Sequence, residues 1–338
     1  MPARQASAAA EEHSSLANPS EARVTHSDLQ IDVDFERKAL ACHVEHTVAI
    51  ERDGTSEVAF DTRDLTLHAV TVAGAPADYA FGEPHPALGR RLAVRLAGKH
   101  KQGDVVSVGI AFTTSPQASA TQWLDPSQTA GGRHPYLFTQ CQAIHARSLL
   151  PCQDTPGAKM TYSAAVRVPA ALTALMSAVP DGAGPSEAGE LSRVGLRRAG
   201  AGPSRVFSFT QALPISTYLL ALAVGELESR ELGPVSRVWS EPSMVEAGAY
   251  EFADTSKFLE AAESIAGPYR WGRYDLLLLP PSFPYGGMEN PCLTFVTPTL
   301  LAGDRSLANV VVRGGSRELL GVNYDRYSKL SNLLGLNG

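Results

Sequence analysis

The 338-residue sequence lacks the patterns that mark several large classes of protein. It has no block of more than three lysines and arginines, and its formal net charge is −6, so a nucleic-acid partner is not expected. It has no apolar run of 18 residues, so no membrane span is expected. The remaining composition, 44% hydrophobic and 19% charged, is that of an ordinary globular protein.

Cysteine is scarce, and the N-terminus carries no secretory pattern. The four cysteines are far apart and form no Cys-x-x-Cys pair, which favours free thiols in a reducing compartment. Residues 1–19 are rich in alanine, serine and glutamate and lack the apolar centre of a signal peptide. We therefore expect a disordered lead-in over residues 1–23 and a cytoplasmic location.

Residues 24–225 are expected to form one mainly β domain. Leu29, Ile31 and Val33 alternate with polar residues, and the same period of two recurs several times up to residue 114. That period is typical of half-buried antiparallel strands. A stretch rich in glycine, proline and serine at residues 179–203 is expected to be a long loop. The predicted architecture is a sandwich or saddle of sheets.

Residues 226–312 have a different pattern and are expected to begin a mixed α/β domain. Apolar residues three and four positions apart predict one amphipathic helix over residues 246–266, ended by Gly267 and Pro268. Short apolar runs at 276–279 and 293–296 predict buried strands. Residues 313–338 do not continue this pattern and are interpreted as a divergent tail.

The candidate binding site is a glycine pair with a carboxylate beside it. Gly286 and Gly287 follow a proline-rich turn, and without side chains they let another peptide approach an extended backbone. Glu289 follows two residues later, where a carboxylate can pair with the free α-ammonium group of a peptide. Taken alone, a glycine pair is more often a simple turn, so the longer string around it decides the interpretation.

The string from Pro280 to Pro298, with Gly-Gly-Met-Glu-Asn at its centre, resembles the exopeptidase motif of the M1 family of zinc aminopeptidases. The resemblance extends from about residue 24 to residue 310 and is strongest toward the leukotriene A(4) hydrolase branch, to which aminopeptidase B is related. The segments that carry it are residues 60–65, 122–124, 135–145, 150–156, 267–269 and 302–307.

The resemblance implies a β-saddle domain followed by the opening part of a thermolysin-like zinc domain. It implies zinc-dependent removal of N-terminal residues from peptides and, in the leukotriene branch, hydrolysis of leukotriene A(4) to leukotriene B(4). The implied ligands are peptide N-termini or leukotriene A(4). Glu289 would hold the peptide amine, and Gln142 would make a polar contact with the substrate. The implied substrate-binding residues are Gln140, Gln142, Tyr285, Gly286, Gly287, Met288, Glu289 and Asn290.

The zinc motif of the family is missing from this sequence. Family members continue after a segment like residues 309–311 into His-Glu-x-x-His, whose histidines bind zinc and whose glutamate acts as general base. Here Arg313 and Arg317 stand at the histidine positions and Gly314 at the glutamate position. Arginine stays cationic and does not bind Zn²⁺. Zinc is therefore expected for the family, but neither a metal nor a retained catalytic residue is expected for this chain.

No other histidine is expected to replace the lost ligands. All nine histidines lie at or before His145, and the one close pair is His43 and His46. A spacing of three on a strand puts the two rings on opposite faces, so they cannot chelate one ion. Both are interpreted as exposed strand histidines.

Three interpretations of the whole chain stay open. In the first, it is an inactive, truncated isoform of an M1 aminopeptidase. In the second, it is a partial or mis-spliced form of a complete, active enzyme. In the third, it is a non-catalytic module that binds peptide N-termini.

Overall fold

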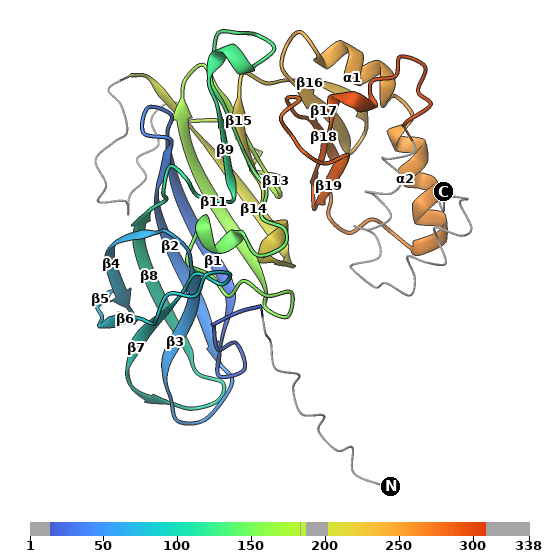
Figure 1. Ribbon diagram of the computed structural model, residues 1–338. Coiled ribbons are helices and arrows are strands. Elements are labelled where there is room, and N and C mark those ends of the chain that lie inside the picture. Colours follow the sequence, from blue (N-terminus) through green and yellow to red (C-terminus); the bar gives the residue numbers. More distant parts are fainter. Residues whose placement is uncertain (1–13, 183, 187–201, 309–338) are drawn as a thin grey trace, which may run out of the picture.

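A computed structural model of the chain describes residues 14–182, 184–186 and 202–308. In this part the chain forms four β-sheets and two α-helices. Figure 1 shows the strands up to β15 as one elongated body, with the strands from β16 onward and both helices in a second body beside its upper end. No helix in the described ranges is both long and apolar enough to cross a membrane.

The largest sheet has eight strands in the order β13-β14-β11-β1-β2-β8-β4-β5. β1 and β11 run parallel, whereas the other neighbours in this sheet run antiparallel. The predicted alternation is confirmed, because Leu29, Ile31 and Val33 are buried and Gln30 is half-buried. In sheet order the strands are Val179–Pro180, Ser204–Ser216, Lys159–Pro169, Ala22–Asp34, Ala39–Ile50, Val105–Thr113, Thr66–Val72 and Ala75–Pro76.

Two smaller antiparallel sheets complete the β domain. The three-stranded sheet β3-β7-β6 consists of Thr55–Thr62, Arg90–His100 and Tyr79–Phe81. The four-stranded sheet β12-β15-β10-β9 consists of Thr173–Met176, Leu222–Gly225, Tyr136–Thr139 and Thr121–Leu124. The 3₁₀-helices are η1 (Pro126–Gln128), η2 (Ala146–Ser148), η3 (Thr217–Leu219) and η4 (Pro298–Leu300).

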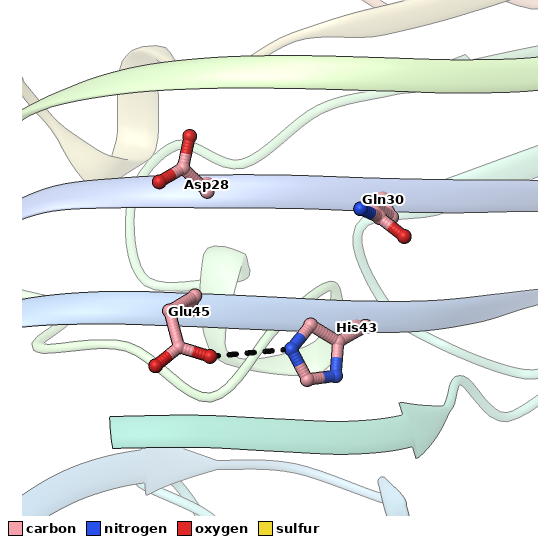
Figure 2. Close-up of a pocket in the computed structure, with 4 residues that line it drawn as sticks. All are labelled: Asp28, Gln30, His43 and Glu45. Atoms are coloured by element: carbon pink, nitrogen blue, oxygen red, sulfur yellow. Dashed lines mark hydrogen bonds and ion pairs between the residues drawn. The ribbon is translucent and has the colours of Figure 1, made fainter. Parts of the chain in front are cut away.

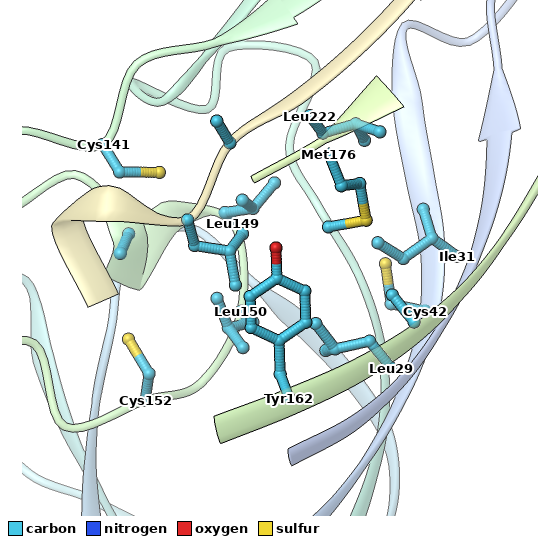
Figure 3. Close-up of a cluster of buried hydrophobic side chains, with 14 of the residues drawn as sticks. Leu29, Ile31, Cys42, Cys141, Leu149, Leu150, Cys152, Tyr162, Met176 and Leu222 are labelled. Carbon is cyan, nitrogen blue, oxygen red and sulfur yellow. The ribbon is translucent and has the colours of Figure 1, made fainter. Parts of the chain in front are cut away.

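The sheets of the β domain enclose one hydrophobic core, whose centre is shown in Figure 3. There the ring of Tyr162 lies among aliphatic side chains that include Leu29, Leu150 and Met176. The Tyr162 hydroxyl and Ser177 Oγ form a hydrogen bond of 2.9 Å, so the polar atom of this ring is satisfied in the core. The predicted mainly β saddle or sandwich is confirmed.

The second body is built on a five-stranded sheet in the order β16-β17-β18-β20-β19. The three central strands run parallel, and each outer pair is antiparallel. The strands predicted at 276–279 and 293–296 are confirmed, although the first begins one residue earlier. In sheet order the strands are Glu228–Gly233, Ser236–Ser240, Asp275–Leu278, Leu293–Val296 and Gly287–Asn290.

The single helix predicted over residues 246–266 is wrong, because the chain forms two helices, α1 (Val245–Glu251) and α2 (Thr255–Ala266). The Phe252 carbonyl accepts hydrogen bonds from both the amide and the Oγ1 of Thr255, at 3.0 and 2.6 Å. A threonine hydroxyl that bonds a nearby carbonyl offers the backbone an alternative to the regular helical pattern. Phe252 is fully buried, so packing holds the break in place.

Side chains from the two faces of the five-stranded sheet enter different cores. Leu276 and Leu278 of β18 pack with Phe252 and Leu259 in a core beneath the helices. Leu277, between them, belongs to the core of the β domain. The opening part of an α/β domain is therefore packed directly on the β domain. The five-stranded sheet and the segment between β18 and β19 also contribute other residues to the β-domain core, namely Leu279, Phe283, Met288, Leu293 and Phe295.

The lead-in predicted over residues 1–23 is wrong for its second half. Asn18 Oδ1 accepts a hydrogen bond of 2.7 Å from the Ala59 amide, and β1 begins at Ala22. Side-chain contacts with residues distant in sequence thus hold residues 14–21 in place. The local sequence pattern does not predict these contacts. Residues 1–13, most of the loop predicted at 179–203, and the tail 313–338 lie outside the described residues.

Candidate functional site

The glycine pair lies where β19 begins, at an edge of the five-stranded sheet as the described residues form it. β19 is the last strand in the sheet order and pairs antiparallel with β20, with Gly287 opposite Val296 and Glu289 opposite Thr294. A Cβ atom at Gly286 would meet nothing within 4 Å, whereas one at Gly287 would lie 3.2 Å from the Phe295 carbonyl oxygen. An edge strand with an accessible backbone can accept a further extended chain.

Burial alternates along this segment and separates its side chains into two groups. Tyr285 is 51% exposed, and Glu289 is half-buried. Met288 and Asn290 are 3% and 2% exposed, so they point into the protein. The Asn290 Nδ2 group has no hydrogen-bond partner among the described residues. Of the predicted binding residues on β19 that carry a side chain, Glu289 is therefore the one that is not fully buried.

An aromatic cluster around Phe283 holds the glycine segment against the β domain. The Phe283 ring lies 5.9 Å from that of Phe138 in β10 and 6.1 Å from that of Phe295 in β20, both edge to face. Tyr285 completes the cluster at 5.8 Å. Such pairs add specific geometry to apolar burial. Sequence reasoning did not single out Phe283, although its spacing of two from Tyr285 in the same string was a visible signal.

The predicted glutamines lie on the loop that follows β10, two and four residues beyond Phe138. The backbone amide of Gln140 donates to the Ala120 carbonyl at 2.8 Å. The buried side-chain oxygen Oε1 of Gln140 has no hydrogen-bond partner among the described residues. Gln142 is exposed, and the peptide bond that follows it is cis. The cluster around Phe283 thus anchors both predicted parts of the site, the glutamine segment and β19.

Within the described ranges, no three histidine, cysteine, aspartate or glutamate side chains are arranged to hold a metal ion. Residues 313–317, where the sequence departs from the zinc motif, lie outside the described residues, so the loss of that motif stays a prediction.

The two histidines of β2 are more buried than the sequence predicted. His43 is half-buried and His46 completely buried, so the prediction that both are exposed is wrong. The His46 ring forms hydrogen bonds with Ser27 Oγ at 2.8 Å and with the Pro151 carbonyl at 3.0 Å, and it stacks on Phe60. Burial lowers the pKa of His46 to about 4. His46 is therefore a neutral core residue.

A pocket of about 280 Å³ lies on the large sheet, away from the glycine segment in sequence. Figure 2 shows Asp28 and Gln30 of β1 facing His43 and Glu45 of β2 across it. Glu45 is engaged by His43 at 3.4 Å and by Ser107, and Asp28 by His26 and Ser163. Because its carboxylates already have partners, we interpret this pocket as a solvated polar face.

Known families match most of the chain. The profile of the Peptidase M1 N-terminal domain matches residues 23–219, and that of the Peptidase family M1 domain matches residues 250–314. The chain belongs to the M1 peptidase family. The first match covers the β domain except for β15, and the second includes α2, β19 and β20.

Curated M1 relatives are similar over 88% of the chain. One is leukotriene A-4 hydrolase of Xenopus laevis, 49% identical over 298 residues. Another is leucine aminopeptidase 2 of Yarrowia lipolytica, 41% identical over 299 residues. The aligned part makes up 47% of the first relative and 43% of the second, so the chain spans about half the length of these M1 proteins.

Solved M1 structures have the same fold. Yeast LTA4 hydrolase in complex with bestatin superposes with a TM-score of 0.81 at 35% identity, covering 93% of this chain and 47% of the yeast chain. An M1 zinc metallopeptidase of Deinococcus radiodurans superposes with a TM-score of 0.68 at 20% identity, covering 88% and 64%. The second likeness concerns the fold alone.

Proposed function

We propose that this chain provides the peptide-amine binding part of an M1 aminopeptidase. The N-terminal residue of a peptide lies along the open edge at Gly286 and Gly287, and the Glu289 carboxylate pairs with its α-ammonium group. The observation that supports this proposal is the edge position of β19 in the described sheet, where exposed glycines lie beside a half-buried carboxylate. Tyr285, Gln140 and Gln142 line the same site.

In the proposed organisation, residues 24–225 form the β-saddle domain and residues 226–312 the opening part of the catalytic domain. In a zinc-loaded M1 enzyme the metal and its neighbouring glutamate activate the attacking water. In this chain Arg313, Gly314 and Arg317 replace those groups. We therefore propose binding without cleavage for the chain as written, in the cytoplasm, with the four free, buried cysteines as support for that compartment.

The test is a binding titration with a C-terminally labelled tripeptide whose amine is either free or acetylated. We expect the free amine to bind at least about tenfold more tightly, because a charge-assisted pair with Glu289 is lost on acetylation. Glu289→Gln should remove that difference, and the exposed Glu260→Gln on α2 should leave it unchanged. Equal affinity for both peptides in the wild-type chain would contradict the proposal.

Leukotriene A(4) is the second ligand to test, because one relative is named as its hydrolase. We expect it to compete with the labelled free-amine tripeptide if both occupy the edge of β19. Turnover of leucine p-nitroanilide with added Zn²⁺ is measured in parallel and is expected to be absent. Zinc-dependent turnover would overturn the proposal of binding without cleavage and leave the binding site standing.

A further inference from the structure

The first described residues cross the β domain as a strap. Asn18 fixes one end, because its Oδ1 accepts from the Ala59 amide at 2.7 Å and its Nδ2 donates to the Glu57 carbonyl at 3.4 Å. Both partners belong to β3. Residues 14–18, called the N-terminal strap from here on, therefore run beside that strand, although 36 or more positions separate them from it in sequence.

The other end of the strap reaches a buried charge cluster, which consists of Asp61, Arg147 and Asp154. Their side chains are 0%, 0% and 1% exposed. Arg147 Nε donates to Asp154 Oδ2 at 3.0 Å, and Arg147 Nη1 lies 3.7 Å from Asp61 Oδ1. Two carboxylates face one guanidinium, so this cluster needs further donors to hold its negative charge away from water.

The strap supplies two of those donors, beside the Asp154 amide, which donates to Asp61 Oδ2 at 2.9 Å, and Thr217 Oγ1, which donates to Asp154 Oδ1 at 2.8 Å. Ser15 Oγ donates to Asp61 Oδ2 at 2.5 Å, and the Leu16 amide donates to Asp61 Oδ1 at 2.6 Å. The Ser14 carbonyl in turn accepts from Arg147 Nη2 at 2.7 Å. The strap thus forms hydrogen bonds with both the negative Asp61 and the positive Arg147 of the buried charge cluster. Desolvation raises the pKa of Asp61, and these two donors counteract that effect.

The same cluster fixes the end of the glutamine loop, residues 140–145. Arg147 lies in η2, which directly follows that loop, and its amide donates to Asp154 Oδ2 at 3.2 Å. The Arg147 carbonyl accepts from the Arg63 amide at 2.8 Å. The loop itself is closed by a 2.8 Å bond from the His145 amide to the Cys141 carbonyl. The middle residue of η2 is therefore tied to the buried charge cluster through its side chain and amide, and to Arg63 through its carbonyl.

We propose that the N-terminal strap is a positioning element for the glutamine loop and acts through the buried charge cluster. The proposal deepens the proposed function and rests on it, since the loop matters to a ligand through Gln142. When the strap leaves, Asp61 loses two donors and Arg147 loses one acceptor. Local unfolding is then concentrated at the buried charge cluster and in the glutamine loop that is joined to it.

Amide hydrogen exchange of two deletion variants tests this proposal. One variant lacks residues 1–16 and the other lacks residues 1–13. We expect the longer deletion to speed amide exchange over residues 140–148 at least about tenfold relative to the shorter one. β2 and β8, neighbouring interior strands of the large sheet, should exchange at unchanged rates. Equal exchange at 140–148 in both deletions, or uniform acceleration across the domain, would overturn the proposal.

A milder pair of variants covers the case in which the longer deletion does not fold. Ser15→Ala removes one donor to Asp61 and is expected to speed exchange over residues 140–148 several-fold. Ser20→Ala, at an exposed position outside the strap, should not. No effect of Ser15→Ala would count against the strap. Since exchange is measured without ligand, this result is independent of whether peptides bind at Glu289.

Discussion

Phe283 lies edge to face with Phe138, with ring centroids 5.9 Å apart and planes at 80°. The first ring belongs to the turn before the glycine segment, and the second to the strand that leads into the glutamine loop. One contact between side chains 145 positions apart thus joins the two segments on which the proposed binding site is built.

Phe283→Ala is expected to destabilise the chain by about 3–5 kcal/mol, because it removes a ring that is 3% exposed and packs on three others. Urea unfolding followed by tryptophan fluorescence measures the change. Val105→Ala, at a side chain that is 65% exposed, is the control and should stay within about 0.5 kcal/mol of wild type. A loss below about 1 kcal/mol at Phe283 would show that the cluster contributes little.

Protonation of His46 is expected to destabilise the fold in mild acid. Its pKa is about 4 in the folded chain against an ordinary value of 6.5, so the unfolded chain binds the extra proton first. The stability that comes from burying the neutral ring is fully present above pH 6.5. It is lost progressively as the pH falls toward 4, by on the order of 3 kcal/mol in total.

Urea unfolding at several pH values between 7 and 4 measures this dependence. His46→Gln should show a shallower loss of stability over that window, while the exposed His68→Gln should follow the wild-type slope. If the wild-type chain and His46→Gln had the same pH dependence, His46 would not be the group responsible.

The thiols are expected to be unreactive in the folded chain. All four cysteines are free and buried, and burial raises the pKa values of Cys42, Cys141 and Cys152. Because the thiolate is the reactive form, a thiol reagent should label none of them quickly in buffer and all four in guanidinium chloride. An added exposed thiol, Val105→Cys, is the positive control. Rapid labelling of the unmodified native chain would contradict the described burial.

The purified chain is expected to contain no stoichiometric zinc after extensive dialysis. Two arginines and a glycine stand where the family has two histidines and a glutamate, and a guanidinium does not bind the ion. Elemental analysis of monodisperse protein gives the answer directly. One equivalent of bound zinc would contradict this prediction and would mean that other residues form a site, and zinc-dependent turnover would then decide whether the chain cleaves peptides.

Much of the fold was predictable from local pattern. Alternating apolar residues predicted the strands of the β domain, and short apolar runs predicted β18 and β20, because a half-buried strand requires a period of two and a fully buried one does not. The break at Phe252 was not predictable, since the spacing of apolar residues continues through it. The bond from Thr255 and the burial of Phe252 decide that break.

The sequence by itself determined the family motif, the glycine pair that leaves a backbone accessible, and the opposite facing of His43 and His46. Only the tertiary structure decided that Met288 and the polar ring of His46 are buried. It also decided that Ser15 meets Asp61. Periodicity specifies that neighbouring side chains point to opposite sides of a strand, but burial and long-range hydrogen bonds depend on which distant segments pack there.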